Sequence, residues 1–234
     1  MQKVLIYLLI KNDFNWNKTF NDLKNRISID TNKINEIIKR IDFEYISIIS
    51  PNYPKYLTKV YKPPFELFYL GNYNLLNKKR ISILGHINDN NLPYLKLLIN
   101  NEYVLCFDYL LMNKNDIKVL IKNNIPSIIY FCDPAKTKEF GELLNDNICL
   151  ISEYCIKPKK TEESYFNRLF FGYKEALMII DKNIELNEFQ ISHINNNKIN
   201  VMSLFKNNKS IKNINPIIIN ELETLKLVFI YKNY

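Results

Sequence analysis

Short apolar runs alternate with amphipathic stretches through most of the chain after residue 80. The strand-like runs cover 81–85, 103–107, 127–132, 148–152, 177–181 and 199–205, and the helix-like stretches cover 92–101, 115–123, 136–144, 164–174 and 186–195. Short strands that alternate with helices of about ten residues imply right-handed crossovers and a mainly parallel sheet. Near-continuous apolar strands fit a sheet that is covered on both faces. The pattern therefore predicts an α/β fold, with a Rossmann-like, mainly parallel sheet and helices on both of its faces.

The chain before residue 81 follows two other patterns. Apolar positions recur at helical spacing over 3–11, 15–26 and 31–41, which predicts three short helices. The next segment carries a Tyr-Pro pair and a Pro-Pro pair. Because proline restricts its own backbone and that of the preceding residue, extended, turning backbone is expected there.

These patterns divide the chain into three parts. They are an N-terminal helical segment (1–44), a proline-containing connector (45–80) and a Rossmann-like domain (81–234). Near the end of the domain, after a polar loop, the pattern predicts a last helix over 216–224 and a last strand over 227–231.

Composition adds a class of partner but no targeting signal. The net charge of +8 favours polyanions such as nucleic acid. The alternative is that the many lysines only solvate the surface of a chain that is also rich in Asn and Ile.

The four cysteines form no CxxC pair, which favours reduced thiols in a cytoplasmic protein. The apolar run at 4–10 is too short to span a bilayer, and no signal-peptide cleavage site follows it, so no membrane partner is expected.

Sequence patterns for catalysis and cofactor binding are missing. The chain has two histidines, His86 and His193, which are too few for a His-rich metal site. It carries no HExxH, GxSxG, Walker A or GxGxxG motif. We therefore expect no catalytic residue, no metal, no cofactor and no enzymatic activity.

Two longer stretches carry a recognisable order of motifs. From Tyr53 to Gly85 the chain reads YP, PP, FELFYLG, NLL and ISILG, and from Leu150 to Asp181 it reads LISEY, FNRLFFG and LMIID. This order resembles the DNA-processing protein family of natural transformation (the DprA or Smf family) over residues 45 to 205. The resemblance implies a Rossmann-like fold and non-catalytic binding of single-stranded DNA. It also implies that the DNA is handed to a recombinase, and it allows a homodimer.

The resemblance assigns the first site residues to two strand ends. Gly85 and His86 stand at the family's Gly-Ser, whose backbone approaches a phosphate, while Ile87 stands where the family has an arginine. We expect both Gly85 and His86 to contact DNA; the alternative for His86 is a loop histidine without a role. Ser152 and Glu153 match the family's Ser-Glu, and we expect them to support the loop.

The third strand end and the flanking basic residues supply the other expected DNA contacts. Asn167, Arg168 and Gly172 match the family's Arg-Asn-Arg-Ile-Ile-Ala-Gly segment, and Phe166 stands at its first arginine. Arg168 is expected to bind a phosphate and Phe166 to stack on an unpaired base. The alternatives are a surface arginine and a core phenylalanine. Lys174 follows on the same predicted helix. The basic candidates before the first strand are Lys78, Lys79 and Arg80.

Two departures from the family motif leave three hypotheses open. The family's glycine-rich turn after the second strand becomes 106–111 (CFDYLL), and its Pro-Gly after the sixth strand becomes 205–206 (FK), so bulky side chains occupy the space that a phosphate needs. The first hypothesis is a single-stranded DNA-binding protein. The second is a degenerate scaffold that acts through a protein partner, and the third is a nucleotide-phosphate-binding enzyme. The first requires Lys79, Arg80 and Arg168 to form one positive face at the carboxyl ends of the strands.

Overall fold

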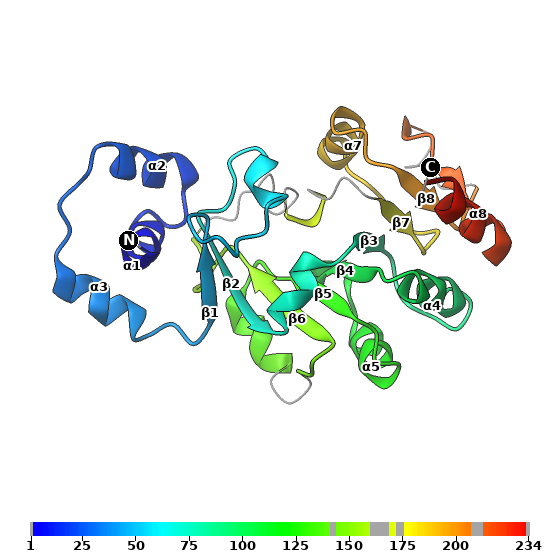
Figure 1. Ribbon diagram of the computed structural model, residues 1–234, viewed down its shortest axis with the longest axis horizontal. Helices are drawn as coiled ribbons and strands as arrows, with labels where there is room; N and C mark the ends of the chain where they lie inside the picture. The colour runs from blue at the N-terminus through cyan, green and yellow to red at the C-terminus, as the bar shows by residue number, and fades with distance from the viewer. Residues whose placement is uncertain (1, 141–143, 160–168, 172–175, 207–212, 233–234) are drawn as a thin grey trace.

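A computed structural model describes residues 2–140, 144–159, 169–171, 176–206 and 213–232 (Figure 1). The strands are β1 (Glu44–Ser47), β2 (Glu66–Gly71), β3 (Arg80–Leu84), β4 (Val104–Asp108), β5 (Ser127–Tyr130), β6 (Ile148–Ser152), β7 (Leu177–Ile179), β8 (Val201–Ser203) and β9 (Ile217–Ile218). The α-helices are α1 (Gln2–Lys11), α2 (Trp16–Lys24), α3 (Thr31–Ile38), α4 (Leu92–Asn100), α5 (Lys114–Lys122), α7 (Glu188–Asn196) and α8 (Leu222–Lys232). The described residues also form the 3₁₀ turns η1 (Leu57–Lys59), η2 (Tyr73–Asn77), η3 (Tyr109–Leu111) and η4 (Pro134–Phe140).

The described strands form one nine-stranded sheet in the order β1-β2-β6-β5-β4-β3-β7-β8-β9. The seven strands from β6 to β9 in that order pair in parallel, and β1 and β2 extend the β6 edge by antiparallel pairing. The predicted α/β, mainly parallel sheet is therefore confirmed. The connector also adds a strand to the same sheet, because β2 pairs with β6.

The direction of chain progression reverses between β3 and β7. From β3 the chain steps outward through β4, β5 and β6, and it then returns to place β7 on the other side of β3. In open parallel sheets such a reversal opens a crevice beyond the carboxyl ends of the two strands, where ligands bind. The β3–β7 boundary therefore locates the candidate site.

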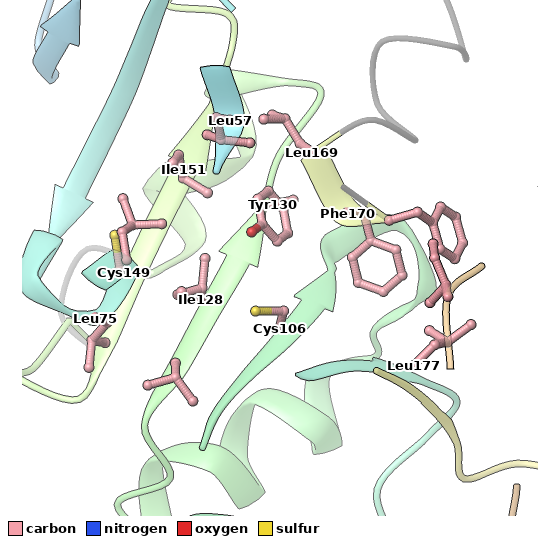
Figure 2. Packing of buried hydrophobic residues seen from close by; sticks show 14 of the residues in the cluster. Leu57, Leu75, Cys106, Ile128, Tyr130, Cys149, Ile151, Leu169, Phe170 and Leu177 are labelled. Carbon is pink, nitrogen blue, oxygen red and sulfur yellow. The ribbon is translucent and has the colours of Figure 1, made fainter. Parts of the chain in front are cut away.

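Two apolar layers cover the two faces of the sheet. Alternate residues of β4 point to opposite faces, so Leu105 packs in the layer under α4 and α5 while Cys106 packs in the other layer. That second layer includes Leu57 and Leu75 of the connector and Phe170, as Figure 2 shows. The connector thus covers the face opposite α4 and α5, and fixes its own position by burying these side chains.

The N-terminal helices gather at one end of the molecule, beside β1 (Figure 1). Trp16 of α2 stacks on Phe65 with ring centroids 5.0 Å apart, and its indole N–H donates to the carbonyl of Pro63 at 2.8 Å. The Pro-Pro pair therefore anchors α2 to the connector. Within the described ranges, no helix combines the length and the hydropathy needed to cross a membrane.

Three predicted elements are wrong. In place of the helix predicted over 136–144, the 3₁₀ turn η4 runs to Phe140, and residues 141–143 lie outside the described residues. At the end of the chain the order is reversed: Ile217–Ile218 pairs with β8 as a strand, and Leu222–Lys232 is a helix. The β-branched residues of this helix suggested a strand, but burial of Leu225 beside α4 outweighs that local preference.

Candidate functional site

The turn after β3 begins at Gly85, which lies at the β3–β7 boundary. Its φ is +118°, and a Cβ atom at this position would lie 2.4 Å from the Cβ of Asp181. Glycine is therefore required both by the backbone conformation and by the close approach of the chain after β7. This agrees with the glycine that the sequence places at the end of ISILG.

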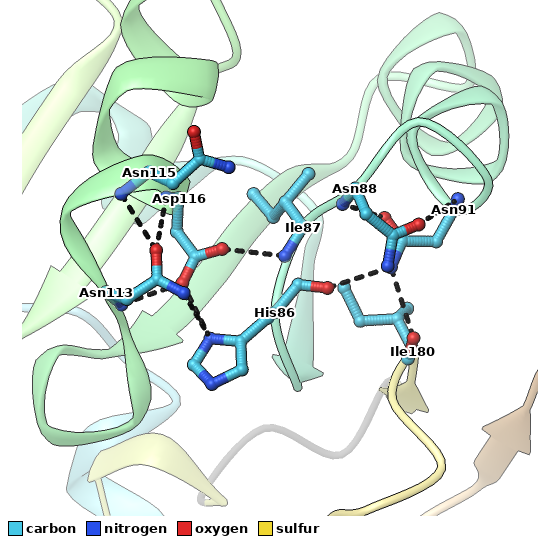
Figure 3. A network of polar contacts seen from close by, with 8 residues as sticks. All are labelled: His86, Ile87, Asn88, Asn91, Asn113, Asn115, Asp116 and Ile180. Carbon is cyan, nitrogen blue, oxygen red and sulfur yellow. Dashed lines mark hydrogen bonds and ion pairs between the residues drawn. The ribbon is translucent and has the colours of Figure 1, made fainter.

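The backbone of this turn is hydrogen-bonded to the carboxylate of Asp116 in helix α5 (Figure 3). Asp116, in the first turn of α5, is 1% exposed and accepts from the N–H of Ile87 at 2.7 Å and from the N–H of Asn113 at 2.8 Å. Its second oxygen also lies 2.9 Å from Nδ1 of His86. The turn therefore carries its own anion at the N–H group of Ile87, where an external phosphate would have to compete with it.

Asparagine side chains complete the hydrogen bonding of the turn. The N–H of Asn88 donates to Oδ1 of Asn91 at 2.9 Å, and the N–H groups of Asn90 and Asn91 donate to Oδ1 of Asn88. The amide of Asn91 then donates to the carbonyl of His86 at 2.9 Å and to that of Ile180 at 3.1 Å. Asn91 thus links the β3 turn to the end of β7 across the boundary where a ligand crevice is expected.

Two residues of this turn, one of them an expected contact, have different environments. Ile87, at the place of the family's arginine, is 2% exposed and belongs to the apolar layer under α4. The side chain of His86 is about half exposed, and Asn113 also approaches its ring, with Nδ2 at 3.1 Å from Nδ1. Of the two, only His86 is accessible to a ligand.

Ser152 and Glu153 lie at the end of β6, beside the end of β5. The hydroxyl of Ser152 donates to the carbonyl of Phe131 at 2.8 Å and accepts from the N–H of Tyr154 at 2.9 Å. It therefore ties the turn after β6 to the end of β5. Glu153 is 9% exposed and lies next to this buried hydroxyl.

The carboxyl ends of β4, β5 and β6 carry acidic rather than basic side chains. Burial chiefly, and then the charges of Asp108, Glu153 and Asp133, raise the pKa of the Cys132 thiol to about 12. Burial also raises the pKa of Asp108 to about 7. Lys157 lies 3.3 Å from the Asp133 carboxylate. The described part of this edge therefore offers a phosphate more repulsion than attraction.

The basic residues before β3 lie at the other end of that strand. Arg80 begins β3 and is 7% exposed; its guanidinium lies 3.5 Å from the ring centre of Tyr56 and donates to the carbonyl of Leu76. Lys78 and Lys79 are exposed. β3 alone spans about 13 Å, and Lys79 and Lys78 lie one and two residues before it, so about 20 Å of extended chain separates Lys79 from Gly85. Contrary to the expected single positive face, Lys79 and Arg80 do not share the carboxyl edge with the Gly85 turn.

Five expected contact residues lie outside the described residues: Phe166, Asn167, Arg168, Gly172 and Lys174. The intervening residues 169–171 are buried, and the carbonyl of Phe170 accepts from the hydroxyl of Ser82 in β3 at 2.6 Å. The chain directly after Arg168 is therefore fixed against β3.

Two residues that shape the turn were not identified from the sequence. Asp116 is thirty positions from His86. Its only local signal is the Asn113–Asp116 capping box, which indicates the start of a helix and not a contact with His86. Nothing in the sequence distinguishes Asn91 from the many other asparagines of the chain. A polar residue that is buried beside a strand end is visible only once the fold is known.

These features define an α/β protein of the Rossmann-like type, with an antiparallel hairpin at one edge and a glycine turn at the reversal of strand order. Residues 44–91 match the sequence model of the DNA recombination-mediator protein A family. The structure is similar to that of DNA processing protein A (DprA) from Streptococcus pneumoniae, with a TM-score of 0.64 and 14% identity over 97% of this chain and 93% of that one.

It is also similar to DNA processing protein A from Helicobacter pylori, which is described with a single-stranded DNA binding mode; the TM-score is 0.60, with 17% identity over 83% of this chain and 98% of that one. A search of curated protein sequences gives no match. The sequence model matched over residues 44–91 and the shared fold support the resemblance to the DprA family that the motifs indicate.

Proposed function

We propose that the protein binds single-stranded DNA without catalysing a reaction on it and presents that DNA to a recombinase in the cytoplasm. The observation that carries the proposal is the joint match of residues 44–91 to the recombination-mediator family and of nearly the whole chain to the DprA fold. The net charge of +8 and the single-stranded DNA binding of the Helicobacter pylori relative agree with it.

Arg168 is the residue that we expect to contribute most to binding a backbone phosphate, by its place in the family motif. Asn167, Gly172, Lys174 and Phe166 accompany it in the proposal. Of the described candidates, His86, Lys78 and Lys79 have exposed side chains that can reach DNA. Gly85 and Ser152 serve as structural supports of the two turns.

The test is fluorescence anisotropy of a labelled oligo-dT titrated with the full chain at low and moderate salt. Phosphate contacts release counterions, so binding should weaken steeply with salt. Loss of one charge-assisted contact in Arg168→Ala should weaken it further by about tenfold. Arg40→Ala removes the same charge from an exposed position after α3 and is the matched control. Equal affinity of the two variants would exclude Arg168 as a phosphate contact.

The second candidate function is a scaffold that has lost this DNA site and acts through a protein partner. The observation that favours it is the Asp116 carboxylate on the Ile87 N–H, together with the acidic strand ends. The same titration separates the two functions. A scaffold shows no binding of oligo-dT by the unmodified protein at low salt.

A further inference from the structure

A groove of about 700 Å³ opens along the connector, next to the start of β3. We call it the connector groove. Its walls come from β1 and β2, from 50–56, from η2 and from Arg80. Its volume lies within the range of about 300–1,000 Å³ that is usual for ligand sites. Among the described residues that line it, none belongs to the Gly85–Asn91 turn or to the acidic strand ends.

Tyrosine is the main aromatic component of the connector groove. Its tyrosines are Tyr45, Tyr53, Tyr56, Tyr69 and Tyr73. Two of these rings, Tyr69 and Tyr73, lie 4.7 Å apart at 43° and are half-buried. The Tyr69 hydroxyl donates to the Glu44 carboxylate and the Tyr73 hydroxyl to the carbonyl of Asn52, both at 2.8 Å. The two rings are therefore held in place before any ligand arrives, which lowers the entropy cost of stacking on them.

The charge of the connector groove is positive. Lys55 and Arg80 line it, and the described lining includes no carboxylate residue. The Arg80 guanidinium stacks on Tyr56, which fixes a cation next to an aromatic ring. Amide side chains at Gln2, Asn52, Asn74 and Asn77 provide both donors and acceptors. This is opposite to the acidic character of the β4–β6 strand ends.

We propose that the connector groove is a second nucleic-acid site, at which unpaired bases of a single strand stack on the tyrosine rings. The exposed Lys55 attracts the phosphates, the buried guanidinium of Arg80 adds to the positive potential, and the amides contact base edges. Fixed aromatic rings in a positive groove are the arrangement that binds single strands without sequence preference. The choice of a nucleic-acid ligand rests on the proposed function, whereas the place of the site rests on the groove alone. A proline-rich peptide also binds aromatic-lined grooves, and the test includes it as a competing occupant.

The first measurement is the affinity of the full chain for a fluorescein-labelled dT12 at low salt. Tyr73→Leu keeps most of the apolar volume but removes the ring, and it should weaken binding by about tenfold, as expected for the loss of one stacked base. Tyr69→Leu should act likewise. Tyr61→Leu is the matched control, because Tyr61 belongs to the same connector, is 77% exposed and does not line the groove. Circular dichroism verifies that each variant is folded.

The second measurement uses the unmodified protein, so that it does not depend on variant folding. A dT12 that contains 5-iodouracil is photo-cross-linked, and the attached peptides are identified by mass spectrometry. Cross-links within 45–56 or 69–77 support the inference. Cross-links confined to other segments, with unchanged affinity of the Tyr variants, overturn it and leave the proposed DNA binding intact.

Two further outcomes also decide against the groove. If the unmodified protein does not bind dT12, the proposed function fails together with this inference. The groove is a peptide site if three results occur together: a labelled proline-rich decapeptide binds, dT12 fails to displace it, and Tyr73→Leu abolishes its binding.

Discussion

Glu66 is a buried carboxyl group in the first position of β2, and it should make folding stability depend on pH. It is 1% exposed, and burial raises its pKa from 4.5 to about 8, while nearby Ser47 and Gln2 oppose this shift without cancelling it. The native protein therefore keeps Glu66 protonated at neutral pH. The perturbation that tests this is Glu66→Gln, which replaces the acid by a neutral side chain of similar shape.

The sign of the effect follows from proton uptake. Below pH 4.5 both the folded and the unfolded states are protonated, and the group has no effect on the free energy of unfolding. Between pH 4.5 and about 8 the unfolded state ionises while the native state does not, so stability falls as pH rises. The full loss amounts to about 5 kcal/mol, at about 1.4 kcal/mol for each tenfold change in proton concentration.

Near pH 5 the free energy of unfolding of Glu66→Gln should therefore be close to that of the unmodified protein. At pH 8 it should be higher by about 4 kcal/mol. The assay is urea unfolding followed by far-UV circular dichroism at four pH values from 5 to 8. Glu36→Gln, at an exposed position of α3, is the control and should give no pH-dependent difference. A Glu66→Gln difference that stays constant over this pH range would refute a buried, neutral carboxyl group.

Three further predictions concern stability and use the same urea assay. Gly85→Ala forces a Cβ against Asp181 and should cost about 3 kcal/mol or more; an unchanged midpoint would mean that the turn moves freely. Asp116→Ala leaves the N–H of the β3 turn without its acceptor and should cost about 3 kcal/mol, whereas Asp89→Ala, at an exposed position, should cost little. Leu225→Ala opens a cavity where α8 meets α4 and should cost about 3 kcal/mol; a loss below about 0.5 kcal/mol would show that the helix does not dock there.

The sequence was sufficient for the central sheet because its strands are continuous apolar runs that need burial on both faces. The run at 81–85 and its glycine turn, for example, appear in the structure as β3 and the Gly85 turn. The last helix was missed because its second half is rich in β-branched and aromatic residues, and because its contact with α4 joins segments more than 120 positions apart.

The environment of the candidate site was predicted less well than the fold. The sequence shows that an isoleucine replaces the family's arginine, but not that Ile87 is buried or that Asp116 occupies the adjacent N–H. Arg80 was expected to contact DNA with Lys79, and its position beneath Tyr56 depends on how the proline-containing connector folds back. Such contacts join segments that are distant in sequence, and no local pattern encodes them.

The two edges of the nine-stranded sheet bear on how copies of the chain could associate. β9 has two paired residues, and β1 at the other edge has four. Edge strands this short offer few free N–H and C=O groups to a neighbouring chain and are poor templates for extending a sheet. A continuous intermolecular sheet is therefore a disfavoured way for copies of this protein to associate.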